Sequence, residues 1–188
     1  LIQDVLQPMR ALYLRMPAVA TLVLAVGAGY LIGGIRSALV VAALTLFIAL
    51  SPWWDRALVT LYMATFGVVI SCLIGFTVGT LCFQNKKSAA FMLGVCDIFQ
   101  TFPSFVYLIP VMMLFGITDT SVLIAVIVYA TIPATRYTIE GLRSVPVGLH
   151  EAATMSGVNK FQRLTKIEFP LAFPHMMLGL NQTIVFAL

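Results

Sequence analysis

The sequence predicts an all-α integral membrane protein, built as a polytopic bundle of helices. Hydrophobic residues make up 61% of the 188 residues and charged residues only 10%, and the mean hydropathy is +1.02. Soluble domains contain about 45–50% apolar and about 25% charged residues, so a soluble core of this size could not bury the apolar surface of this chain. Long apolar runs separated by Pro, Gly and charge clusters favour helices over a β-barrel, whose strands alternate in short segments.

The first part of the chain, residues 1–56, is expected to hold an amphipathic segment and two membrane-spanning helices. Residues 1–17 mix charged and apolar side chains, which is typical of a helix that lies at the membrane surface. Two apolar runs follow, at 18–33 and 37–54, and each is predicted to cross the membrane.

The larger part, residues 57–188, is expected to contain the core of the protein. Apolar runs predict three uninterrupted spans in it, at 57–83, at 121–135 and from residue 171 onward. A polar segment, 136–170, separates the last two of these spans. The chain does not begin with Met and stops inside an apolar run, so we interpret it as a fragment of a longer protein, truncated at the C-terminus.

A further apolar run, residues 89–116, is interrupted by Asp97, Gln100 and Pro103. Proline removes a backbone donor and clashes with the preceding turn, so we expect the helix to break or kink near residues 102–103. Irregular backbone at membrane depth is tolerated only against protein or a water-filled cavity, and an aspartate in a span needs the same surroundings. This segment is therefore expected to be either a polar lining or gate, or a hydrogen-bonded tie between helices.

Basic residues indicate that the polar segment 136–170 lies in the cytoplasm. In that orientation Arg36, Lys86 and Lys87, which stand in other loops, also lie inside. Cytoplasmic loops are enriched in Lys and Arg, so the two sets of residues support the same topology.

A short helix is expected in the first half of this cytoplasmic segment. Ser144 can cap a helix that begins near Pro146 and runs to about Ser156, and Gly157 can supply its left-handed end. Helical spacing brings small or aliphatic residues onto one smooth face. That face consists of Leu149, Ala152, Ala153 and Ser156.

A second helix is expected directly after the first. Asn159 followed by Gln162 is typical of a capping pair, and Pro170 is expected to mark the turn into the last span. The residues alone leave two interpretations open, a solvated loop with two incidental helices or an element on which a soluble partner docks.

The cytoplasmic segment resembles the EAA motif of permeases from ATP-binding cassette (ABC) importers. In "EAATMSGVNKFQRLTKIEFP", residues 151–170, the Glu-Ala-Ala triplet, the following glycine, Ile167 and Pro170 stand at the spacing of that motif, with Phe169 in place of the usual leucine. The stretches "DIFQTFPSFVYLIPVMMLFGI" at 97–117 and "GLNQTIVFAL" at 179–188 are similar to permeases of glycine betaine/proline importers, which handle quaternary ammonium solutes.

The resemblance implies a fold and a set of partners. The fold would be the type I ABC importer permease (MetI-like) bundle, in the bacterial inner membrane beside a second permease copy, as a homodimer. Cytoplasmic ATPase subunits would bind beneath it, and a periplasmic or tethered binding protein would deliver a glycine betaine- or proline-like compatible solute used in osmoprotection. The chain would be a transport subunit and not an enzyme, with ATP and Mg²⁺ held by the partner ATPase and no cofactor, metal or nucleic acid bound by the chain itself.

The resemblance also implies functional residues, with residues 147–157 as a coupling helix seated in a groove of the ATPase. The expected ATPase-coupling residues are Glu151, Ala152, Ala153, Gly157, Ile167 and Pro170. The expected substrate-path residues, at the break and in the last span, are Asp97, Gln100, Thr101, Phe102, Pro103, Phe105, Tyr107, Asn181, Gln182 and Thr183. Aromatic faces in this set suit a trimethylammonium group, and helix packing is the alternative role for them.

Other classes of membrane protein are alternatives. A secondary transporter or channel-like protein for a small polar solute also has broken helices, but it is expected to carry more ionisable groups within its spans than Asp97 alone. A membrane enzyme would need catalytic pairs, and the sequence has no H-E-x-x-H, Ser-His pair or paired carboxylates. The cysteines, Cys72, Cys82 and Cys96, lack C-x-x-C spacing and are expected to be free thiols.

Overall fold

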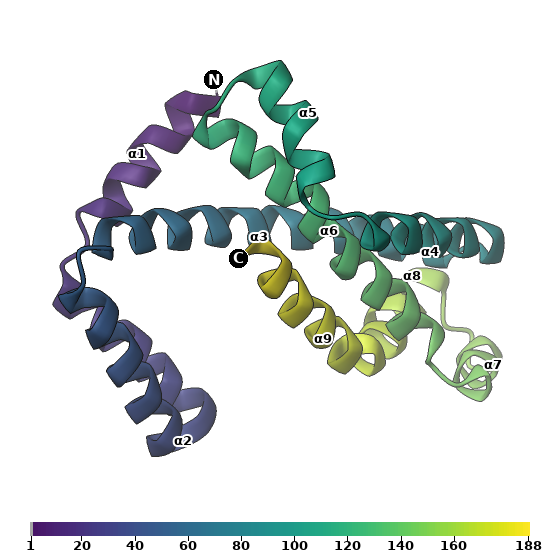
Figure 1. The fold of residues 1–188 in the computed structure, drawn as a ribbon. Helices are drawn as coiled ribbons and strands as arrows, with labels where there is room; N and C mark the ends of the chain where they lie inside the picture. Colours follow the sequence, from purple (N-terminus) through teal and green to yellow (C-terminus); the bar gives the residue numbers. More distant parts are fainter. Residues whose placement is uncertain (1) are drawn as a thin grey trace. The chain divides into compact units, whose positions relative to one another are not determined.

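The computed structural model describes residues 2–188, with side chains from residue 6 onward, and its regular elements are helices (Figure 1). The elements in chain order are α1 (Ile2–Leu14), α2 (Ala18–Leu50), α3 (Trp54–Phe83), α4 (Lys86–Thr101), α5 (Phe105–Phe115), α6 (Asp119–Arg143), α7 (Val147–Met155), α8 (Lys160–Arg163), the π-helix η1 (Leu164–Glu168) and α9 (Phe169–Ala187). The predicted all-helical membrane class is confirmed.

The chain divides into two compact units, one ending at Met63 and the other running from Ala64 to Leu188. The division lies within α3, as does the boundary expected after residue 56. The second unit carries every candidate site residue.

Helix α2 of the first unit consists of two arms. Its backbone leaves the helical region at Gly33 and Gly34, and Gly34 has a φ of +68°, which glycine adopts without steric cost. A Cβ on Gly29 would lie 3.1 Å from Cγ2 of Val41, so the second arm folds back along the first. The two predicted spans correspond to these arms, except that the second ends at Leu50.

Length and composition make three helices of the described chain candidates for crossing a membrane, namely α2, α3 and α6. Helices α4 and α5 together make a fourth candidate, bent by 86° at the break between them (Figure 1). The kink predicted at residues 102–103 is confirmed, since α4 ends at Thr101 and α5 begins at Phe105. The predicted last span forms α9, which is not among the candidates because prolines, a histidine and two amides interrupt its apolar sequence.

Helix α6 is the central helix of the second unit and packs against α4, α5 and α9. A small apolar core forms where its C-terminal end meets α9, with Leu142, Ala172 and Met176 buried there. The span was expected to end at about residue 135, and the helix that contains it continues to Arg143. Arg136, which the sequence predicts just outside the span, pairs with two carboxylates and donates to one amide.

Helix α3 crosses α6 at two glycines that allow close approach. A Cβ built on Gly75 would lie 2.4 Å from Cβ of Ala134, and one on Gly79 would lie 2.6 Å from Cβ of Thr138. Small residues at helix crossings let two backbones approach, as the Gly-x-x-x-Gly spacing indicates.

We expect Gly75→Leu to destabilise the second unit, because the Ala134 backbone itself blocks the added side chain. Overpacking of this kind costs about 1–3 kcal/mol. The measurement is thermal unfolding of the purified permease in detergent. Gly94→Leu is the matched control, since a Cβ there meets no atom within 4 Å; an equal loss of stability in both variants would contradict the role of the crossing.

Candidate functional sites

Helix α7 follows α6 in the chain and stands at the outer end of the second unit (Figure 1). Gly157 ends it with a φ of +73°, as predicted, and Val158 N–H donates to the carbonyl oxygen of Ala153 at 3.1 Å across that turn. The predicted cap by Ser144 is wrong. Because α6 extends to Arg143, Ser144 ends α6 instead, and its hydroxyl donates to the Gly141 carbonyl oxygen at 2.7 Å.

The second cytoplasmic helix begins with the predicted capping pair. Gln162 N–H donates to Oδ1 of Asn159 at 2.8 Å, and Asn159 N–H donates to Oε1 of Gln162 at 3.2 Å. The prediction of a turn at Pro170 is wrong, since the chain stays helical from Lys160 to Ala187. The π-helical turn η1 widens the helix just before the proline and accommodates its ring and its missing N–H.

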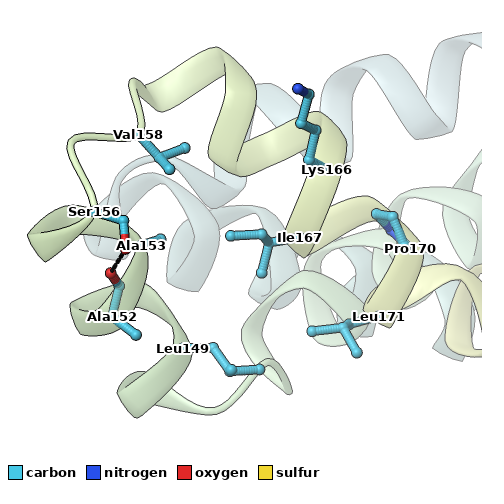
Figure 2. Close-up of a pocket in the computed structure, with 9 residues that line it drawn as sticks. All are labelled: Leu149, Ala152, Ala153, Ser156, Val158, Lys166, Ile167, Pro170 and Leu171. Atoms are coloured by element: carbon cyan, nitrogen blue, oxygen red, sulfur yellow. Dashed lines mark hydrogen bonds between the residues drawn. The ribbon is translucent and has the colours of Figure 1, made fainter.

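A groove of about 540 Å³ lies between α7 and the helix that follows it (Figure 2). We call it the α7 groove, and its lining is mostly apolar. It is lined by Leu149, Ala152, Ala153, Ser156, Val158, Lys166, Ile167, Pro170 and Leu171.

Four of the six predicted coupling residues line the α7 groove, although they come from two different helices. Ala152 and Ala153 lie on the α7 side, while Ile167 and Pro170 lie on the other side (Figure 2). Ala153 is buried and Ala152 is exposed. The other two residues lie elsewhere: Glu151 lines a smaller hollow on α7, and Gly157 faces open space.

An ion-pair cluster that sequence reasoning missed ties α7 to the next helix. The carboxylate of Glu168 is only 2% exposed, and its Oε1 lies 2.9 Å from Nε of Arg163 and 3.0 Å from Nδ1 of His150. Arg163 and Glu168 are five residues apart, a spacing that does not align side chains on an α-helix. The π-turn brings them together, so helical periodicity gave no signal for the pair.

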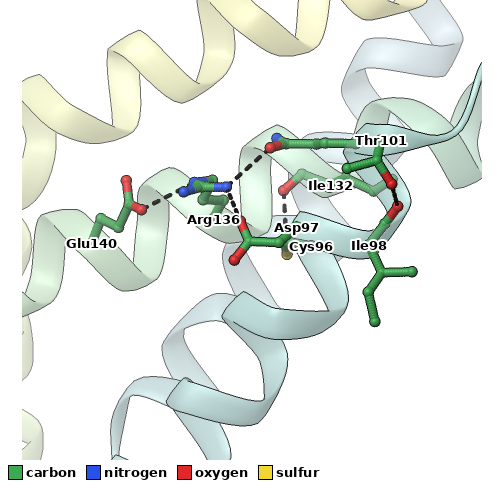
Figure 3. Close-up of polar contacts among 8 residues, drawn as sticks. Cys96, Asp97, Ile98, Thr101, Ile132, Arg136 and Glu140 are labelled. Atoms are coloured by element: carbon green, nitrogen blue, oxygen red, sulfur yellow. Dashed lines mark hydrogen bonds and ion pairs between the residues drawn. The ribbon is translucent and has the colours of Figure 1, made fainter.

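Within the bundle, Arg136 joins α4 to α6 through polar contacts (Figure 3). Its Nε donates to Oε1 of Glu140 at 3.0 Å, and its Nη1 donates to Oδ1 of Asp97 and, at 3.0 Å, to Oε1 of Gln100. Asp97 therefore forms a hydrogen-bonded tie between α4 and α6, which is one of the two roles expected for this segment. Its partner was missed because Arg136 was assigned to a loop.

A second cavity, which we call the polar pocket, lies beside this network and has a volume of about 520 Å³. It is lined by Gln100, Pro133, Arg136, Tyr137, Glu140, Gln182 and Phe186. The pocket brings together Gln100 and Gln182, which the sequence placed in the substrate path. The sequence analysis did not predict Tyr137, Glu140 or Phe186: the predicted span stops before the first two, and Phe186 is one of many apolar residues in the last span.

The other predicted path residues do not line the polar pocket. Tyr107 stacks on Phe99 with 5.4 Å between ring centroids, and its hydroxyl donates to the Phe99 carbonyl oxygen at 2.7 Å. Thr183 is buried and bonds the Gly179 carbonyl oxygen. The remaining members of the set are exposed, namely Thr101, Phe102, Pro103, Phe105 and Asn181.

The fold and these sites define a polytopic helical membrane protein with a short helix, α7, and an open groove at one end of its second unit. Residues 67–188 match the family of the binding-protein-dependent transport system inner membrane component, and the chain belongs to that family. The resemblance to permeases of this type and the inner-membrane location are thereby confirmed.

Relatives of known name are all transport permeases rather than enzymes. The chain is 89% identical over its full length to the trimethylamine N-oxide transport system permease protein TmoV of Pelagibacter ubique, and 45% identical over 97% of its length to TmoV of Ruegeria pomeroyi. It is 32% identical over 98% of its length to the glycine betaine/proline betaine transport system permease protein ProW of Escherichia coli. The chain spans 26%, 28% and 52% of the length of these relatives.

Proposed function

We propose that this chain is part of the permease subunit of an ABC importer that carries a small methylated ammonium zwitterion, of the trimethylamine N-oxide type, into the cell. The observation that carries the proposal is helix α7, held at the cytoplasmic end of the bundle with an open apolar groove beside it. An importer whose ATPase is a separate subunit needs such a contact to transmit motion into the membrane.

The α7 groove is proposed as the surface that the ATPase contacts. Ala152 and Ala153 have side chains small enough for a partner to come close to the α7 backbone, and Ile167 and Pro170 continue the same apolar surface. Glu151 is exposed and is available to donors on the partner. The Gly157 turn sets the direction in which the chain leaves α7 toward α8.

The substrate class rests on the named relatives. The TmoV relatives share more of the sequence than the glycine betaine permeases do, which favours trimethylamine N-oxide over the glycine betaine- or proline-like solute expected from the sequence alone. Trimethylamine N-oxide and glycine betaine both carry a trimethylated nitrogen, so these two solutes belong to one chemical class, to which proline does not belong. A binding protein on the outer side would deliver the solute, and a second permease copy would complete the pathway.

The test is solute uptake by the full-length permease, reconstituted in proteoliposomes with its ATPase and binding protein. We expect uptake of labelled trimethylamine N-oxide that requires ATP on the ATPase side and continues in the presence of a protonophore. Uptake that stops with the protonophore and ignores ATP would instead support a secondary transporter, and uptake of glycine betaine alone would correct the substrate.

A further inference from the structure

The polar pocket is lined by one cation and one carboxylate, Arg136 and Glu140, and the same cation also pairs with Asp97, which does not line the pocket. Arg136 is shared between the carboxylates of Asp97 and Glu140, so the three side chains together carry a formal charge of −1. Arg136 engages one oxygen of each carboxylate (Figure 3). The second oxygen of Glu140 is therefore available to a positively charged ligand at the pocket wall.

Aromatic rings line the same pocket as Glu140. Tyr137 follows Arg136 on α6, and Phe186 approaches from α9, where its ring lies 4.8 Å from that of Tyr129. Aromatic faces attract quaternary ammonium groups, and a carboxylate nearby adds to that attraction. These lining residues suit a methylated ammonium group.

Donors for an anionic oxygen lie in the same pocket. Arg136 presents a guanidinium, and the amides of Gln100 and Gln182 come from α4 and α9. Arginine and amide N–H groups bind oxyanions with charge-assisted hydrogen bonds. A cavity of about 520 Å³ lies within the range of about 300–1,000 Å³ typical of small-molecule sites.

The pocket lies beside the point at which the fourth span is broken. Gln100 is in the last turn of α4, next to its end at Thr101, and Arg136 stands seven residues before the end of α6 at Arg143. At 1.5 Å per residue, Arg136 lies roughly 10 Å from the cytoplasmic end of its helix. Irregular backbone at such a depth is typical of a site that lines an aqueous path.

We propose that the polar pocket binds the transported solute, a small zwitterion with a methylated ammonium group, on the cytoplasmic side of the pathway. Glu140, Tyr137 and Phe186 would hold the ammonium end, while Arg136 and the two glutamines would hold the anionic oxygen. Because that oxygen competes with Asp97 for Arg136, occupancy would loosen the tie between α4 and α6. This inference rests on the proposed function and assigns the substrate a position within it.

The test measures trimethylamine N-oxide uptake by the complete importer at several concentrations of loaded binding protein. We expect Phe186→Leu and Glu140→Gln each to reduce kcat/KM for uptake about threefold to tenfold. Phe173→Leu is the matched control, because Phe173 lies on the same helix, is exposed and does not line the pocket. Glu140→Asp should restore part of the loss, because it keeps the negative charge at this position.

Two failures are distinguishable. If the wild-type importer takes up neither trimethylamine N-oxide nor glycine betaine, the proposed function fails and the ligand of the pocket fails with it. If the wild-type importer is active and both pocket variants match it, or if Phe173→Leu loses as much as Phe186→Leu, the pocket assignment alone is overturned. ATP hydrolysis stimulated by the binding protein verifies that each variant importer assembles. If Phe186→Leu does not assemble, the test relies on Glu140→Gln, which conserves the side-chain volume.

Discussion

Uptake by the assembled importer should fall about tenfold or more in Ala152→Trp, while the ATPase subunits continue to hydrolyse ATP. Ala152 is exposed on the wall of the α7 groove, so an indole ring there occupies space that the proposed partner surface needs (Figure 2). A loss of about 1.4 kcal/mol of interface energy corresponds to a tenfold change, and central interface positions commonly exceed that value. The α7 helix itself should remain intact, because the new side chain points away from the buried Ala153 contact.

The measurement compares solute uptake and ATP hydrolysis in the same proteoliposomes. Phe161→Trp is the matched control, since Phe161 is 73% exposed on α8 and lines neither the α7 groove nor the smaller hollow on α7. Uptake should be close to wild type in that variant. Normal uptake by Ala152→Trp would exclude the α7 groove as the docking surface, whereas equal losses in both variants would point to a general effect of added bulk.

Features set by local chemistry could be predicted from the sequence. Pro103 breaks the fourth span wherever that span lies in the bundle, and the φ of +73° at Gly157 follows from glycine's freedom to adopt it. The capping box at Asn159 and Gln162 is equally local, because its two bonds join residues of one turn. For such features, neighbouring residues are enough to determine the backbone.

Features set by distant partners could not be predicted. An isolated arginine is costly in a span, so the sequence predicts a span that ends before Arg136. In the structure, Asp97, which is distant in sequence, lies beside Arg136 and pairs with it. Because the predicted span ends before Arg136, Tyr137 and Glu140 are absent from the predicted site. The helix that carries this span also holds two further ionisable groups, Arg136 and Glu140, beyond the predicted end of the span.

Replacing Glu168 should detach α7 from the helix that follows it. The buried Glu168 carboxylate accepts from Arg163 at 2.9 Å and pairs with His150 at 3.0 Å, and His150 is the only one of the three that lies on α7. Hydrogen bonds to charged groups contribute about 1.5–3 kcal/mol each, and the lower end applies here because His150 and Arg163 are partly exposed. We therefore expect Glu168→Ala to reduce uptake strongly through loss of α7 positioning.

Hydrogen exchange of the α7 amides distinguishes this positioning role from a direct contact with the partner. In Glu168→Ala the amides of residues 149–156 should exchange at least about tenfold faster in the permease alone, because a local tie worth about 1.4 kcal/mol is lost. Glu151→Gln, an exposed neighbour outside the cluster, is the control for exchange and should leave these rates unchanged.

A double-mutant cycle then tests whether Glu168 acts through His150. If it does, His150→Ala and Glu168→Ala together should be less harmful than the sum of the two single changes, because each removes the same tie. Additive losses would show that Glu168 stabilises the segment through Arg163 alone. In that case α7 would depend on the Gly157 turn and its apolar contacts for its position, and Ala152→Trp would remain the direct probe of docking.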